Sequence, residues 1–271
     1  MKKEKLITKI FVPATFLAMI IVNFLANFLP INNMSTGGVS ELYPNLFTPA
    51  PLTFSIWGII YFLVALYVLY QLGLFKKVKR DQALLSKVGF YFSISSIANI
   101  IWIFFWHYDL ILLSFLTMLV LLSSLIKMVS ILREEKLDNW QKLLVKTPFS
   151  VYLGWISVAT IANFVVLMKS LNFSMLANNH VCFTILMLSI GAIVGLFVLI
   201  KKKDMLYGLV FIWAYLGIYI KHTGTMFYDG TYSRIIFAVS VYLILFVMAE
   251  LIAFFGLKEK QKTLIEKIFR K

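Results

Sequence analysis

The sequence predicts an all-α polytopic membrane protein with about eight transmembrane helices, and three observations predict it. Of its 271 residues, 61% are hydrophobic and 14% are charged, and the mean hydropathy is +0.88. Soluble domains are typically about 45–50% apolar and about 25% charged, so this composition excludes a soluble globular enzyme, a coiled coil and a disordered chain. Eight segments are long and apolar, and basic residues concentrate on alternate connections between them.

Each of these segments is expected to be a helix that crosses the bilayer. Crossing the hydrocarbon core takes roughly 20 apolar residues, and lipid offers no hydrogen-bond partner to the backbone of an open strand. The expected helices cover about residues 10–29, 53–73, 88–106, 110–131, 147–168, 180–200, 204–221 and 233–256. The first is too long for an ordinary signal peptide, and no convincing cleavage site follows it. Only Trp106 to Asp109 join the third and fourth, which predicts a tight antiparallel hairpin.

The distribution of positive charge orients these helices. Cytoplasmic connections carry an excess of Lys and Arg. With the N-terminus in the cytoplasm, 23 of the 26 basic residues lie on the cytoplasmic side, and only Lys169, Lys221 and Arg234 lie outside. We therefore expect an integral protein of a bacterial cell membrane with both termini cytoplasmic. The net charge of +14 is assigned to topology and to attraction of anionic lipid, not to nucleic-acid binding.

Few polar side chains interrupt the predicted spans. Glu250 is the acidic residue that lies well inside one, and it either reaches the cytoplasmic surface, pairs with Lys201–Lys203, or couples ion movement to transport. His107, His180 and His222 lie at span ends, where histidine is usually hydrated, and no metal-binding motif includes them.

The segment 258–271 is a basic tail that contains four apolar side chains. Two interpretations are open, namely a short amphipathic helix on the inner membrane surface and a frayed tail. The apolar side chains are those of Leu264, Ile265, Ile268 and Phe269.

Three spans carry aromatic and amide side chains at helical spacing. The sets are Phe54, Trp57 and Tyr61; Asn99, Trp102 and Trp106; and Tyr152, Trp155, Ala159 and Asn163. Spacings of three and four residues place each set on one helix face. At a rise of about 1.5 Å per residue, the sets lie mostly in one layer on the outer side of the midplane. Because an unpartnered amide in hydrocarbon is costly, Asn99 and Asn163 are expected to face protein or ligand.

Two interpretations of these sets are open. Aromatic walls with a few polar groups are typical of a small-molecule pocket. Helix packing through asparagine hydrogen bonds, with the small residue Ala159 permitting close approach, fits the spacing equally well. Trp140 and Trp213 are assigned to the interfacial aromatic belt.

A long connection, Pro30 to Leu52, precedes the second span and is expected to be the long non-helical segment outside the membrane. Long loops in compact proteins are commonly lids or are disordered. Its prolines stiffen the entry into the helix that carries Trp57, so the sequence predicts a lid over the outer end of the aromatic layer.

These motifs resemble those of the TspO/MBR family of tryptophan-rich sensory and translocator proteins. The stretch Phe47–Tyr61, with prolines followed by Phe54, Trp57 and Tyr61, resembles the loop and second helix of the family. Ala98-Asn99-Ile100-Ile101-Trp102 resembles its third-helix motif, and Pro148 followed by Trp155, Ala159 and Asn163 resembles its fifth-helix motif. The resemblance covers about residues 8–170.

The resemblance implies a five-helix bundle that binds a tetrapyrrole or a sterol-like lipid in a pocket under the first loop. It implies that Phe54, Trp57, Tyr61, Asn99, Trp102, Trp155, Ala159 and Asn163 line this pocket, and the spacing adds Tyr152. The expected organisation is a core at 1–170, three additional helices at 171–257 and the tail at 258–271. The expected partners are membrane lipids and a hydrophobic small molecule such as porphyrin. A tetrapyrrole would be a ligand rather than a resident cofactor, and homodimerisation is an open alternative.

Three functions therefore compete. The favoured one is a ligand-binding sensor or carrier, and the second is an eight-span transporter with Glu250 as a coupling residue. The third, a membrane enzyme acting on porphyrin or an isoprenoid, is less favoured because the sequence offers no evident acid–base pair.

The charge asymmetry makes the topology directly testable. Reporter fusions after Lys79 and after Lys202 should both report a cytoplasmic location, because both sites lie on lysine-rich connections. A periplasmic signal from either fusion would refute the eight-span topology.

Overall fold

The computed structural model describes residues 7–29, 31–75 and 80–269, and this part of the chain is helical without β-strands. The eight candidate membrane spans are Lys9–Phe28, Pro51–Leu72, Gln82–His107, Ile111–Glu134, Asn139–Ser170, Asn179–Lys202, Met205–Thr223 and Ser233–Gly256. Eight spans were expected from hydropathy, and the described residues confirm the number and the order. The lysines at positions 2–5 and 76–79, which contributed to the charge pattern, lie outside the described residues.

Two spans begin earlier than hydropathy indicates, because polar residues form their first turns. Helix α5 (Gln82–His107) is capped by the Asp81 carboxylate, which accepts the backbone N–H groups of Ala83 and Leu84 at 3.0 and 3.1 Å. The fifth span begins with α7 (Asn139–Gln141), where Asp138 and Gln141 form a reciprocal capping box. Such caps satisfy backbone donors that the first turn leaves free, so the helices extend beyond their apolar stretches.

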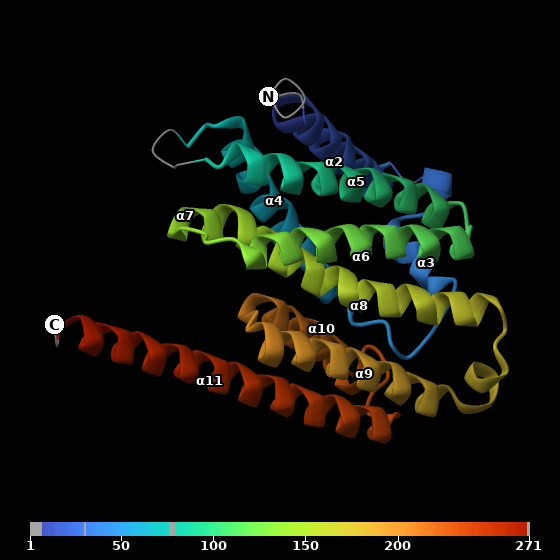
Figure 1. The fold of residues 1–271 in the computed structure, drawn as a ribbon. Coiled ribbons are helices and arrows are strands. Elements are labelled where there is room, and N and C mark those ends of the chain that lie inside the picture. Colours follow the sequence, from blue (N-terminus) through green and yellow to red (C-terminus); the bar gives the residue numbers. More distant parts are fainter. Residues whose placement is uncertain (1–6, 30, 76–79, 270–271) are drawn as a thin grey trace.

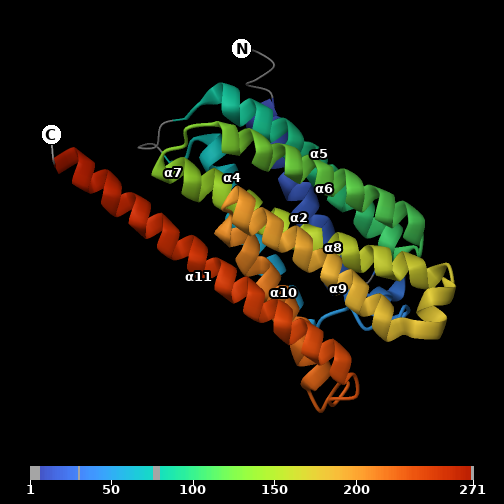
Figure 2. The same ribbon diagram turned by 60° about the horizontal axis from the view of Figure 1, so that its bottom comes forward.

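The spans form two groups that meet at α8. Helices α2 (Val12–Phe28), α5, α6 (Ile111–Glu134) and α8 (Thr147–Ser170) lie side by side, with α4 (Ile56–Leu72) packed against α2 and α8 (Figure 1). On the other side of α8 lie α9 (Ser174–Lys202), α10 (Met205–Thr223) and α11 (Ser233–Phe269) (Figure 2). Of the eight spans, the one containing α8 is the most buried.

Buried side chains from both groups belong to one hydrophobic cluster. The expected hairpin is present, since α5 ends at His107 and α6 begins at Ile111. Whether residues 1–170 and 171–257 act as separate units stays a prediction.

The C-terminal segment continues the last span as helix. Helix α11 runs without a break from Ser233 to Phe269, well beyond the end of the apolar span at Gly256, and projects past the bundle (Figure 1). Neither a frayed tail nor a separate surface helix describes this arrangement. The side chains of Leu264, Ile265, Ile268 and Phe269 lie outside the described residues.

The long loop (residues 31–55) is more ordered than expected. The sequence suggested a non-helical segment, but it contains the short helices η2 (Ile31–Asn33), α3 (Thr36–Glu41) and η3 (Pro51–Ser55). Pro30 lies outside the described residues. We call the end of the bundle at which this loop lies the loop end, and the opposite end the lysine-rich end.

The first half of the long loop is bound to the end of α5. The two ring nitrogens of His107 lie 3.1 Å from the Ile31 carbonyl oxygen and 3.0 Å from the Thr36 hydroxyl. The Trp106 indole donates to the Thr36 carbonyl at 3.0 Å, and the Tyr43 hydroxyl donates to Asp109 at 2.7 Å. Burial and this contact with Asp109 raise the pKa of Tyr43 to about 12, so the phenol stays a neutral donor at physiological pH.

The second half of the loop is bound to α10, which lies about 160 residues further along the chain. Trp213 donates its indole N–H to the Thr53 carbonyl at 2.8 Å, and His222 Nε2 lies 2.9 Å from the Leu46 carbonyl oxygen. The Ala50 N–H donates to the Gly217 carbonyl at 3.0 Å. The loop thus bridges the two helix groups.

Three expectations from the sequence are corrected by these contacts. His107 and His222 are buried, at 1% and 0% exposure, and are not hydrated interfacial residues. Trp213 is half-buried and binds the loop, a role that assignment to the aromatic belt did not anticipate.

Gly217 determines how closely the loop approaches α10. A Cβ atom at this position would overlap the Thr53 side chain. We expect Gly217→Ala to cost about 1–3 kcal/mol through overpacking and to lower the melting temperature of the protein. Cleavage of the long loop by added protease should rise in parallel.

Gly58→Ala is the matched control, because a Cβ there meets nothing within 4 Å. Equal melting temperatures and equal cleavage in the two variants would show that the order of the loop does not depend on its contact with α10.

Candidate functional site

Five aromatic side chains from two spans form a cluster toward the loop end. Trp57 lies at its centre, with its ring centroid 5.3 Å from Tyr61, 5.9 Å from Tyr152 and 6.3 Å from Trp155. Phe54 contacts Trp155 edge-on at 5.8 Å. The sequence predicted that Phe54, Trp57 and Tyr61 share a helix face, and the structure brings this face against that of Tyr152 and Trp155.

A pair of asparagines lies beside this cluster. Asn23 Nδ2 on α2 donates to Asn99 Oδ1 on α5 at 2.6 Å and to the Met19 carbonyl at 2.9 Å. Asn99 is fully buried, as expected, and its amide lies next to the Tyr152 hydroxyl. Asn23 was missed at the sequence level, although an asparagine in the middle of the first apolar span was the available signal.

Asn163 is placed differently. It is buried, as expected, and its Nδ2 donates to the Ser114 hydroxyl of α6 at 3.1 Å. This contact joins α6 to α8, which is the arrangement that the helix-packing interpretation predicts. Ala159 is half-buried on the same face of α8, one turn from Trp155. The binding roles of Asn163 and Ala159 stay predictions.

Trp102 and Trp106 form a second aromatic pair on α5. Their rings stack with centroids 5.8 Å apart and planes at 21°. The two indoles differ in hydrogen bonding, since Trp106 donates to the long loop, whereas the buried Trp102 Nε1 has no partner among the described residues.

Four buried polar groups in this region have no hydrogen-bond partner among the described residues, namely Asn99 Nδ2, Trp102 Nε1, Tyr152 OH and Trp155 Nε1. Both α5 and α8 run toward the loop end, so Trp102 lies one turn beyond Asn99 and Trp155 lies one turn beyond Tyr152. More than about 90% of buried polar groups are hydrogen-bonded, and leaving one unpaired costs about 1–3 kcal/mol. Because Asn99 Nδ2 and the Tyr152 hydroxyl lie next to one another, the two indole N–H groups of Trp102 and Trp155 are the donors best suited to an additional polar partner.

Two cavities lie elsewhere in the structure. One of about 500 Å³ is at the lysine-rich end, lined by Arg133, Lys142, Lys146, Lys201 and Lys202 among others, and a groove of about 340 Å³ is lined by α5 and α6. In the aromatic cluster the rings themselves are in contact. Among the described residues, no group of three or more His, Cys, Asp or Glu side chains is placed to bind a metal ion.

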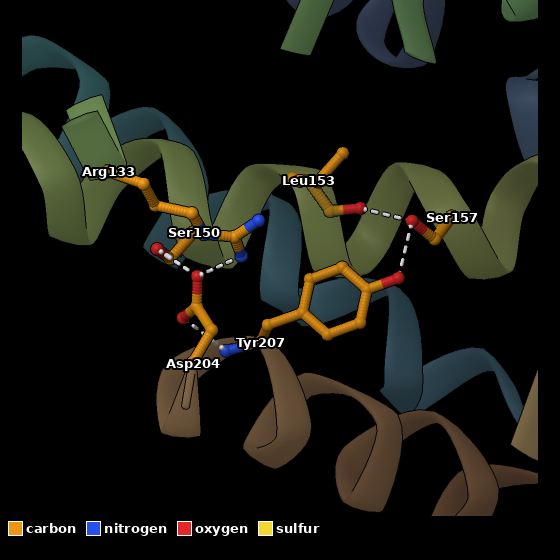
Figure 3. A network of polar contacts seen from close by, with 6 residues as sticks. All are labelled: Arg133, Ser150, Leu153, Ser157, Asp204 and Tyr207. Atoms are coloured by element: carbon orange, nitrogen blue, oxygen red, sulfur yellow. Dashed lines mark hydrogen bonds and ion pairs between the residues drawn. The ribbon is translucent and has the colours of Figure 1, made fainter. Parts of the chain in front are cut away.

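A separate polar network lies near the lysine-rich end (Figure 3). The Asp204 carboxylate accepts from Arg133 and from the Ser150 hydroxyl, both at 3.0 Å. The Tyr207 hydroxyl donates to Ser157 at 2.9 Å. The network joins α6, α8 and the start of α10, and nothing in the sequence motifs predicted it.

Glu250 lies close to this network but is not part of its hydrogen bonds. It is 7% exposed, and neither carboxylate oxygen has a hydrogen-bond partner among the described residues. The expected alternatives of reaching the membrane surface or pairing with Lys201–Lys203 are therefore not what the structure shows.

Comparison with known proteins places the chain in a family. Residues 9–256 match the family described as TSPO-like protein. No curated protein and no solved structure matches the chain. The match extends across all eight spans, whereas the motifs on which the resemblance was based cover only the first five.

Proposed function

Because the chain belongs to the family of TSPO-like proteins and has eight apolar helices, it is an integral membrane protein, and we infer that it is of a sensor or ligand-binding type. We propose that it binds a tetrapyrrole in the layer formed by the aromatic cluster and the four unpartnered polar groups. The alternative of a sterol-like lipid uses the same site.

The observation that carries this proposal is the set of unpartnered groups on α5 and α8. Asn99 Nδ2, Trp102 Nε1 and Trp155 Nε1 are all donors, and the Tyr152 hydroxyl can also donate. A ligand that satisfies them must present more than one acceptor. Tetrapyrroles that carry carboxylates supply several, whereas a sterol supplies one hydroxyl group, so the donor set favours the tetrapyrrole.

The aromatic rings supply the remaining part of the interaction. Edge-on and stacked ring pairs are worth only about 0.5–1.5 kcal/mol beyond their buried area. A flat ligand can therefore replace the contacts of Trp57 with Tyr152 and Trp155 by stacking of its own. The long loop lies across this end of the bundle and would cover the bound molecule.

An eight-span transporter is the second candidate. It is supported by the extension of the family match to residue 256 and by the burial of Glu250 within α11. An intramembrane carboxylate is by default a functional group.

Trp155→Phe tests the proposed site, because it keeps an aromatic ring and deletes the indole donor. We expect protoporphyrin IX to quench the tryptophan fluorescence of the wild-type protein in bilayers, and Trp155→Phe to raise the Kd by about tenfold. Hydrogen bonds to a charged acceptor contribute about 1.5–3 kcal/mol, and about 1.4 kcal/mol corresponds to tenfold in affinity.

Trp140→Phe is the matched control, because Trp140 is 54% exposed and lies at the start of the fifth span, about four helical turns before Trp155. Ala159→Phe separates binding from helix packing. Lost quenching with an unchanged melting temperature supports the site. A lowered melting temperature, with no quenching in the wild-type protein, would mean that these residues only pack helices.

A further inference from the structure

Glu250 is buried in an unusual position between α10 and α11. It lies on α11, and its carboxylate rests on the backbone of α10 at Gly208, where a Cβ atom would overlap Glu250 Oε1. The two Leu199 methyl groups of α9 pack at the same place, 3.0 and 3.1 Å from the position of that Cβ atom. A Cβ at position 208 would displace the carboxylate from this position, and glycine leaves the position open.

Among the side chains that the structure describes, no positive charge balances the carboxylate in this position. The Arg133 guanidinium is 3.0 Å from Asp204 and is held by it. Asp204 is itself close enough to repel an ionised Glu250. On α9, Lys201, Lys202 and Lys203 are exposed.

The remaining titratable group of this region, Tyr207, donates its hydroxyl to Ser157 of α8. An ionised carboxylate that is buried without a partner is strongly disfavoured, whereas its protonated form is not. These contacts leave Glu250 with neither a counter-charge nor a hydrogen-bond donor.

We propose that Glu250 is a proton-binding site, occupied by one proton while α10 and α11 are packed together. It lies in the three C-terminal helices, and its occupancy does not require a ligand at the aromatic cluster.

The proton site lies near the polar network of the lysine-rich end. The cavity of about 500 Å³ there is lined by Arg133, which contacts Asp204. Asp204, buried at 4% exposure, is close enough to Glu250 to interact with it electrostatically. Movement of α11 away from Gly208 would expose Glu250 and release the proton, so occupancy of the site is linked to how α10 and α11 pack.

Dicyclohexylcarbodiimide identifies such a site, because this apolar reagent adds to a carboxyl group in its protonated form. In the full-length protein in bilayers at neutral pH, we expect a covalent adduct on Glu250, located by peptide mass spectrometry. Glu134 and Glu135 are exposed and serve as internal controls that remain unmodified. Labelling of Glu250 should fall as the pH is raised, and E250Q should lose the adduct.

Thermal unfolding supplies the second measurement and does not depend on access of the reagent. Glutamine is a neutral isostere of the protonated acid, so E250Q should melt like the wild-type protein below the ordinary pKa of glutamate, about 4.3, where the carboxyl is protonated in both the folded and the unfolded state. Raising the pH from there to neutral should destabilise the wild-type protein more than E250Q, because the unfolded state releases the proton that the folded state keeps.

Gly208→Ala tests the contact between the Glu250 carboxylate and α10. Its methyl group would displace the carboxylate, so the melting temperature should fall, and the loss should be smaller when Glu250→Ala is also present because the two sites are in contact. Identical pH dependence of unfolding in wild-type protein and E250Q would overturn the proposal. So would suppression of the labelling by Na⁺ at constant pH, since the carboxylate would then bind a metal cation instead of a proton.

Discussion

Hydrocarbon offers no hydrogen-bond partner, and this single constraint explains most of the structure. It requires the backbone to form helices wherever the chain crosses the membrane. It also requires each polar side chain within the bundle to find its partner in the protein, as Asn23 does with Asn99, Asn163 with Ser114, and Asp204 with Arg133. Among the described residues, two sets of groups break the rule at the candidate sites, and Tyr67 OH, Gln71 Oε1, Ser96 Oγ, Arg133 Nε and His222 Nδ1 also lack a partner. The donors around the aromatic cluster suit a ligand with acceptors, and the Glu250 carboxyl suits a proton.

The three C-terminal helices are integrated with the first five through the long loop. One half of the loop is held by His107 and Trp106 of α5, and the other by Trp213 and His222 of α10. The side of the loop that leads into Phe54 and Trp57 is therefore fixed by a helix beyond the five-helix core. This agrees with a family match that continues to residue 256. It also gives α9–α11 a physical route by which a change near Glu250 reaches the loop end, since α10 contacts both Glu250 and the loop.

Local patterns in the sequence predicted the fold and the faces of the helices, but not the partners of those faces. Hydropathy located eight spans because each is long and apolar, and it missed only polar first turns such as those capped by Asp81 and Asp138. The spacing of Phe54, Trp57 and Tyr61 defined a face from helix geometry alone. The burial of His222 and the contact of Trp213 with Thr53 depend on residues about 160–180 positions apart, which no local pattern records. Asn163 had two possible environments, and only the position of Ser114 on the neighbouring helix distinguishes them.

The central claim is that the unpartnered donors near the loop end belong to a ligand site and not to helix packing. A crystal structure of the full-length protein with protoporphyrin IX bound tests it most directly. The account predicts carboxylate oxygens of the porphyrin within hydrogen-bond distance of Trp102 Nε1 and Trp155 Nε1, with the macrocycle against the Trp57 ring. Porphyrin bound only at the lysine-rich end or in the groove between α5 and α6, with both indole nitrogens still unpartnered, would contradict it.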